Sequence, residues 1–290
     1  LMFNELTDFV ARNTDNPFFL NWATPIPHVA LQADNNWLEY YKSKFGEEEP
    51  YLGQMGYFPH QNPRAAYAAM VSYLDGNIGK LVQQLKDNGI YENTLIVFTS
   101  DNGPSYAGGA DPEYFNSAKP IKGEYGRGKG YLYEGGIRVP MIATWPDRIK
   151  PGSSSDHISA HYDMLATFSD IAGYELPEES DGVSMLPTFL SEENQEEHEF
   201  LYWEFPSYGG QVAIRMGDWK VVRQNLKDDK KEATLELYNL REDPTETSNI
   251  ASEHPDILKK AAAIFAQERT QPELEHFKIP LIADGLLNEE

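Results

Sequence analysis

Apolar side chains recur every three or four positions between Asn62 and Gly89, the spacing that lines one face of an amphipathic helix. The segment opens with Asn62-Pro63, an N-cap residue followed by a proline suited to the first helical turn. It closes with Asn88-Gly89, a common helix stop. The pattern therefore predicts one long helix between these signals. A shorter run of the same spacing predicts a helix over 162–172.

Short, continuous apolar runs predict buried strands, because they are too short for a useful helix. Three such runs lie at 18–23, 94–99 and 139–145. The run at 94–99 follows the long helix directly, and a helix that leads into a buried strand is half of a parallel crossover unit. These runs indicate an α/β domain. Between the second and third lies a glycine- and tyrosine-rich segment, 101–134, without periodicity, and loops of that length are usually functional or mobile.

The C-terminal third has a different pattern. Four segments of strand length alternate with tight turns, at 200–205, 211–216, 219–223 and 234–238. This alternation predicts an antiparallel sheet, on which a final helix over 255–268 would pack. An acidic run at 192–199 precedes the sheet. We therefore divide the chain into an α/β portion, 1–191, and a C-terminal lobe, 192–290.

Charge and composition exclude several classes of partner. Lys and Arg number 24 against 46 Asp and Glu, and the net charge of −22 repels nucleic acid and anionic lipid. The apolar runs are far shorter than the about 20 residues of a membrane-spanning helix. The first residues show no signal-peptide pattern. Without cysteine there is no disulfide, thiolate metal site or cysteine nucleophile.

Polar residues follow the predicted strands, where open α/β sheets bind ligands. Asp101-Asn102 offers a carboxylate and an amide oxygen, both suited to calcium or magnesium, although Asp-Asn-Gly also closes strands as a simple turn. Lys129 lies between two glycines and could meet an oxyanion, or be a solvated loop lysine. His28 follows a proline-rich loop and could donate a proton, or have no role.

Five groups of residues, in order along the chain, resemble motifs of the sulfatase family, within the alkaline-phosphatase-like superfamily. They are Phe18-Phe19-Leu20 with Pro27-His28; Ser100-Asp101-Asn102-Gly103; Lys129 with Tyr133-Glu134-Gly135-Gly136-Ile137-Arg138-Val139-Pro140; Arg215-Met216-Gly217-Asp218-Trp219-Lys220; and Leu237-Tyr238-Asn239-Leu240 with Asp243-Pro244 and Glu246. Chance matches do not keep such order. Tyr202-Trp203-Glu204-Phe205 further resembles arylsulfatase-type bacterial members that act on sulfated sugars.

The resemblance implies an alkaline-phosphatase-like α/β/α sandwich with a small C-terminal antiparallel-sheet lobe. It implies hydrolysis of a sulfate ester of a carbohydrate or aryl substrate, with calcium as cofactor and a formylglycine nucleophile. Matched by position, Asp101 and Asn102 are calcium ligands, Lys129 binds sulfate, and His28 contacts sulfate or the leaving oxygen. It also implies a periplasmic or secreted protein whose partner is a sulfated small molecule or glycan.

The chain departs from the family pattern in its nucleophile. The family's Cys/Ser-x-Pro-x-Arg motif precedes the first matched strand, and the nearest string here, 144–148, begins with threonine and continues a predicted strand. We therefore expect a sandwich incomplete at its N-terminus, a chain inactive by itself, and a nucleophile outside it. Lys122 is a rival to Lys129. The alternatives are a phosphodiester or phosphonate hydrolase of the same superfamily, or a non-catalytic remnant that binds anions or glycans.

Overall fold

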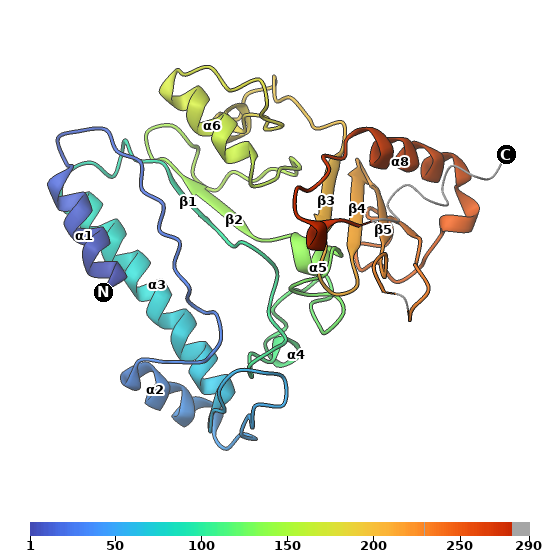
Figure 1. The fold of residues 1–290 in the computed structure, drawn as a ribbon. Helices are drawn as coiled ribbons and strands as arrows, with labels where there is room; N and C mark the ends of the chain where they lie inside the picture. Colours follow the sequence, from blue (N-terminus) through green and yellow to red (C-terminus); the bar gives the residue numbers. More distant parts are fainter. Residues whose placement is uncertain (229, 280–290) are drawn as a thin grey trace.

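The computed structural model describes residues 1–228 and 230–279. Its N-terminal part is built on α3 (Pro63–Asp87), the long helix predicted from the apolar spacing. Two helices that the sequence pattern did not predict, α1 (Met2–Arg12) and α2 (Asn35–Phe45), pack against α3 (Figure 1). The carboxylate of Asp34 caps α2 by accepting hydrogen bonds from two backbone amides of its first turn. No residue of α2 is buried, so it lacks the apolar stripe that reveals a helix.

Helix α3 contains a glycine at a position where a side chain would fit. Gly79 is exposed, has helical backbone angles, and would place a Cβ with no atom within 4 Å. Gly79→Ala is therefore expected to raise the free energy of unfolding by about 0.5–1 kcal/mol. Gly89→Ala is the matched control, since its φ of +70° is unfavourable for alanine, and it should destabilise. Urea unfolding of both variants measures the difference, and a loss of stability in Gly79→Ala would contradict the prediction.

Two predicted strands form a ribbon. Strand β1 (Ile96–Thr99) pairs antiparallel with β2 (Met141–Thr144), and Ile96 lies opposite Thr144. The expected parallel crossover is therefore wrong for the described residues, in which the only strand paired with β1 is antiparallel. The strand expected at 18–23 is also wrong, because this segment has no pairing partner there. An apolar run gives a preference for extended backbone but does not supply the neighbour that a strand needs.

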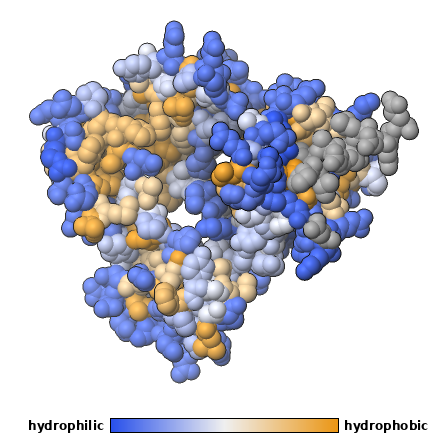
Figure 2. All heavy atoms as spheres, in the orientation of Figure 1, coloured by the Kyte–Doolittle hydropathy of each residue, from blue (hydrophilic) through white to orange (hydrophobic). Residues whose placement is uncertain are grey.

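The β1–β2 ribbon is also more exposed than its sequence predicts. Phe98, Met141 and Ile142 are exposed, with Ile142 retaining 64% of its accessible surface. Figure 2 shows apolar side chains gathered on this face between α3 and the ribbon. The expectation of fully buried strands is wrong here, because no layer among the described residues covers this side of the ribbon.

The C-terminal antiparallel sheet is confirmed. Its strands are β3 (Leu201–Phe205), β4 (Gln211–Met216), β5 (Trp219–Arg223) and β6 (Glu236–Asn239), in that spatial order. Helix α8 (Pro255–Gln267) covers one face, where Val212, Val221 and Phe265 are fully buried. Alternate positions such as Ala213 and Val222 point to the other face and pack on residues 131–133. The sheet is therefore buried on both sides (Figure 1).

Short helices complete the chain. They are α4 (Pro112–Phe115), α5 (Glu134–Ile137), α6 (Asp163–Ala172), α7 (Leu186–Leu190) and two 3-10 turns at Ala251–Glu253 and Glu275–Phe277. The predicted helix α6 is confirmed and ends at Gly173. Within residues 1–228 and 230–279, no helix combines the length and apolar character needed to cross a bilayer.

Candidate active site

Three loop segments meet at the end of β1. The turn at 101–104 follows the strand, the loop at 122–131 runs beside it, and α5 closes the group. The Gly103 amide donates to the Gly136 carbonyl at 2.9 Å, and the Lys129 amide donates to the Pro104 carbonyl at 3.0 Å. The two hydrogen bonds fix the Asp101-Asn102 turn against the loop that carries Lys129.

Glycine is required where these backbones touch. A Cβ on Gly103 would lie 1.8 Å from the Gly135 carbonyl oxygen, and a Cβ on Gly135 would lie 1.5 Å from that of Lys122. No side chain fits at such distances, so glycine here permits close backbone approach. The glycine-rich composition of this loop is therefore explained by packing, and the packing positions Lys129.

Asn102 and Lys129 line one cavity of about 250 Å³. Its other lining side chains include Tyr131, Ile137, Phe205 and Tyr208, so it lies between the 101–137 loops and the end of β3. Among the described residues, no carboxylate lies within ion-pair distance of Lys129. An unpaired ammonium in a chain of net charge −22 favours an anionic ligand at this cavity. Lys122, the rival lysine, is not among the lining residues.

The neighbouring Asp101-Asn102 turn offers oxygen atoms that fit a calcium ion. The Asn102 side-chain nitrogen donates to the Gly103 carbonyl at 2.9 Å, and its side-chain oxygen accepts no hydrogen bond from the residues that the structure describes. Asp101 is exposed. Hard oxygens of this kind are calcium ligands, but calcium takes about 6–8 of them. In residues 1–228 and 230–279, no group of three or more His, Asp and Glu side chains is placed to hold a metal, so these two would be part of a larger ligand set.

His28 is exposed and does not line the cavity. Its Nδ1 contacts the Val29 carbonyl, and its ring packs edge-on against Tyr57 at 5.9 Å between centroids. The next residue, Val29, packs against Gly108 of the 101–134 loop, because a Cβ on Gly108 would lie 2.6 Å from the Val29 side chain. The structure thus brings Asn102 and Lys129 together, while the convergence of His28 with them stays a prediction.

A buried charge cluster lies behind the cavity. Lys220 of β5 is fully buried, and its ammonium lies 2.9 Å from a carboxylate oxygen of Glu134 and 3.1 Å from one of Glu246. The second Glu246 oxygen accepts the Glu134 backbone amide at 2.8 Å. The other Glu134 oxygen faces Arg215 at 3.6 Å. Three of the motifs noted in the sequence therefore meet at one point, which joins α5 to the C-terminal sheet.

The pKa values of the two carboxyl groups of this cluster are shifted in opposite directions. Burial alone would raise the pKa of Glu134, but Lys220, Arg215 and Arg138 together hold that pKa below its ordinary value. Burial dominates for Glu246 and raises its pKa, with Lys220 only partly opposing the shift. The sequence alone did not predict a role for these residues. The signal that could have revealed the cluster was a charged residue inside each of two largely apolar segments, Glu134 within 131–137 and Lys220 within 219–222, whereas Glu246 lies in a polar segment that gives no such signal.

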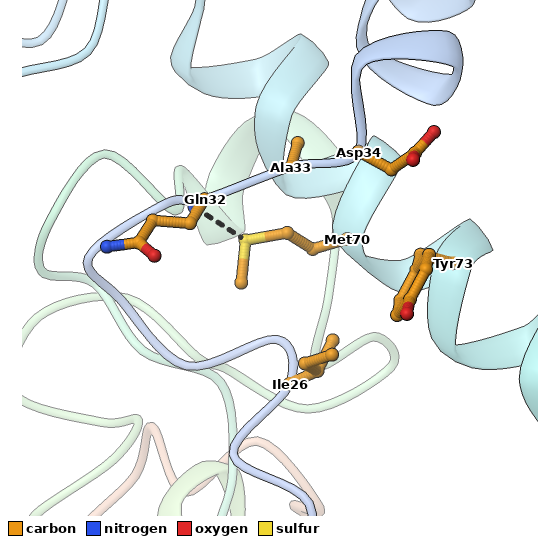
Figure 3. A pocket seen from close by; sticks show the side chains of 6 residues that line it. All are labelled: Ile26, Gln32, Ala33, Asp34, Met70 and Tyr73. Atoms are coloured by element: carbon orange, nitrogen blue, oxygen red, sulfur yellow. Dashed lines mark hydrogen bonds between the residues drawn. The ribbon is translucent and has the colours of Figure 1, made fainter. Parts of the chain in front are cut away.

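A second cavity, of about 280 Å³, lies between the loop at 26–34 and α3 (Figure 3). None of its lining residues belongs to the Lys129 cavity or to the buried charge cluster. Met70 lies at its centre and its sulfur accepts the Gln32 backbone amide at 3.4 Å. Asp34 lies at the rim of this cavity. Figure 3 shows its carboxylate directed away from the cavity, and it caps α2. A cavity whose lining contains a carboxylate and no lysine, arginine or histidine does not suit an anion, so we place the candidate site at Lys129.

Comparisons with known proteins identify the family of the chain. Residues 1–174 match the family model described as Sulfatase. Residues 123–270 match the model described as N-sulphoglucosamine sulphohydrolase, C-terminal. The two matches overlap at the segment that contains Lys129 and α5.

Individual relatives match over most of this chain. It is 31% identical to a sulfatase of Formosa agariphila over 83% of its length and 43% of that protein. It is 26% identical to N-acetylgalactosamine-6-O-sulfatase of Bacteroides thetaiotaomicron, over 92% of this chain and 50% of the relative. A crystal structure of Ps i-CgsB in complex with k-i-k-neocarrahexaose matches with a TM-score of 0.75 and 30% identity, covering 95% of this chain and 56% of that one. The chain spans half or less of the length of these two curated relatives.

Proposed function

Because the chain belongs to the sulfatase family, we propose that the protein hydrolyses the sulfate ester of a carbohydrate or aryl substrate, with Lys129 binding the sulfate group. The observation that carries this proposal is the cavity that Lys129 shares with Asn102, in which the ammonium has no acidic partner among the described residues. A sulfate ester presents to such a cation three oxygens that share one negative charge. Electrostatic binding of that kind is a main source of rate enhancement where charge develops on transferring groups.

The reaction breaks the bond between sulfur and the ester oxygen and transfers the sulfur to an oxygen nucleophile. Water is consumed, and the alcohol leaves with a proton while inorganic sulfate is released. We assign His28 the donation of that proton, because a histidine side chain can act as a general acid. The formylglycine nucleophile implied by the resemblance is not among these 290 residues, and we propose that a segment outside them supplies it.

Asp101 and Asn102 are proposed to hold calcium. When bound, calcium would supply positive charge toward the sulfate oxygens. Asp101→Ala is expected to weaken calcium affinity by about tenfold or more, because it removes the charged ligand of the pair. Calorimetric titration with calcium measures the change. Asp147→Ala removes an equally exposed carboxylate elsewhere and should leave the affinity unaltered; equal losses in both variants would refute the assignment.

The remaining expectations also stand as proposals. Residues 1–191 are assigned to the catalytic α/β domain and 192–290 to a C-terminal lobe, with the 131–137 segment packed on the sheet of that lobe. The substrate is a sulfated small molecule or glycan. This is supported by relatives named for N-acetylgalactosamine-6-O-sulfatase activity and by a structural neighbour complexed with neocarrahexaose. We also propose a periplasmic or secreted location.

A sulfate-release assay tests the proposal on the longest natural polypeptide that contains these residues. The substrates are N-acetylgalactosamine 6-sulfate and 4-nitrophenyl sulfate, with bis(4-nitrophenyl) phosphate as the competing chemistry. Release of inorganic sulfate from either ester supports the proposal. Preferential hydrolysis of the phosphate diester, or sulfate binding without turnover, would replace it by one of the two alternatives. The family matches give neither alternative support.

A further inference from the structure

Four tyrosines form a continuous aromatic surface beside Lys129, which we name the tyrosine wall: Tyr106, Tyr125, Tyr131 and Tyr208. Tyr131 and Tyr208 stack nearly parallel, with centroids 5.6 Å apart and planes at 8°. Tyr125 meets Tyr106 edge-on at 4.8 Å and Tyr131 at 5.9 Å. Three members come from the 101–134 loop and Tyr208 comes from the turn after β3. The wall therefore joins the two parts of the chain at the cavity.

The backbone fixes Tyr208 in this position. Its φ is +49°, a left-handed conformation that a bulky aromatic residue rarely adopts. Its ring lies against the backbone of Gly130, where a Cβ would be 2.3 Å from Tyr208 Cε2. Gly130 follows Lys129 directly, so the ring and the lysine line the same cavity. Strained residues of this kind are held in place by their surroundings and concentrate at functional sites.

The wall keeps much of its surface free. Tyr125 and Tyr208 retain 64% and 56% of their accessible surface. Tyr106 interacts electrostatically with Tyr208, and Tyr131 with Tyr125. Burial and these partners raise the pKa of Tyr106 and Tyr131, so their hydroxyls are neutral and can both donate and accept. The surface thus offers aromatic faces together with hydroxyl groups.

We infer that the tyrosine wall is the subsite for the sugar ring that carries the sulfate, and that Tyr208 is its specificity-determining residue. This inference rests on the proposed function, because it places the sulfate at Lys129. A pyranose has an apolar C–H face that stacks on an aromatic ring, and hydroxyls that pair with tyrosine hydroxyls. The cavity of about 250 Å³ is below the range of about 300–1,000 Å³ that drug-sized ligands occupy, which suits one ring.

Calorimetric binding tests the inference on the longest natural polypeptide that contains these residues. The probes are N-acetylgalactosamine 6-sulfate, phenyl sulfate and inorganic sulfate. Tyr208→Ala is expected to weaken binding of the sugar sulfate by about 3- to 10-fold, the range for loss of an aromatic contact. Its binding of inorganic sulfate should change less than about twofold. Tyr208→Phe keeps the ring and should retain most of the sugar affinity, which separates stacking from the hydroxyl.

Tyr174→Ala is the matched control, because Tyr174 is an exposed tyrosine outside the cavity lining. Circular dichroism of each variant confirms that it is folded. If Tyr208→Ala weakens the binding of sugar sulfate and of inorganic sulfate equally, or changes neither affinity, the proposed subsite is wrong although the proposed function stands. If phenyl sulfate loses more affinity than the sugar sulfate, the wall selects an aryl group and the inference is overturned. Absence of sulfate-dependent binding by the unsubstituted protein overturns the proposed function as well.

Discussion

Lys220→Met is expected to lower the free energy of unfolding by about 3–5 kcal/mol, the usual cost of removing one partner from a buried ion pair. Lys220 is fully buried between Glu134 and Glu246, at 2.9 and 3.1 Å. Methionine fills a similar volume but leaves both carboxylates without their shared cation. Urea unfolding measures the loss. Lys231→Met is the control, because Lys231 forms an exposed pair with Asp228 at 3.9 Å, and such pairs contribute little.

The stability lost in Lys220→Met should depend on pH. Without the ammonium, burial raises the pKa of Glu246 further, above its value in the unfolded chain. A group whose pKa is raised by folding stabilises the protein at low pH, and that stabilisation is lost as the pH rises through the folded-state pKa. The deficit should therefore be smaller at about pH 5 than at about pH 7.5. A deficit that is independent of pH would show that lost packing, and not the unpaired carboxylates, causes the effect.

Lys129→Ala is expected to lower kcat/KM for sulfate esters by about 100- to 1,000-fold, the effect of removing one preorganised group that stabilises transition-state charge. Lys129 belongs to the cavity lining, and its ammonium has no acidic partner within ion-pair distance among the described residues, so we expect its removal to leave the folded core intact. The assay uses the longest natural polypeptide that contains these residues and measures inorganic sulfate.

Two further variants make this result specific. Lys150→Ala removes an exposed lysine outside the cavity lining and should keep full activity. Lys122→Ala tests the rival lysine, whose carbonyl oxygen packs against Gly135 but whose side chain does not line the cavity. If Lys122→Ala loses the greater share of activity, the sulfate contact belongs to Lys122 and the proposed geometry is wrong.

The sequence predicts those parts of the fold whose information is local. The helix at Pro63–Asp87 has its spacing, first turn and stop within its own residues, and the C-terminal sheet has alternating strands with tight turns. The segment 18–23 was predicted as a strand and forms none, because pairing depends on a partner that an apolar run does not specify. The expected burial of Phe98 and Ile142 is wrong for a related reason, because an apolar run does not specify the layer that would cover the paired strands.

In the candidate site, too, local sequence features predicted some residues, whereas contacts between distant parts of the chain were not predicted. The Asp-Asn-Gly turn after a predicted strand singled out Asn102 as a candidate, and the flanking glycines singled out Lys129. The structure places both residues at one cavity. The contact between Glu134 and Lys220 joins residues 86 positions apart and leaves no periodic signal in the sequence. The stacking of Tyr131 on Tyr208 likewise depends on the docking of the sheet on the loop. Contacts of this range are set by tertiary packing, so only a structure reveals them.

The same separation along the chain fixes the order in which the cavity can form during synthesis. Glu134 emerges from the ribosome 86 residues before Lys220 and 112 residues before Glu246. At about 5–20 residues per second, Glu134 waits about 6–22 s for the last of these partners. The 131–137 segment, whose apolar side chains pack on the finished sheet, is unprotected for that time. We therefore expect nascent chains that end before Glu246 to be cut by protease at this segment and to engage chaperones there, whereas chains that extend beyond Glu246 bury it.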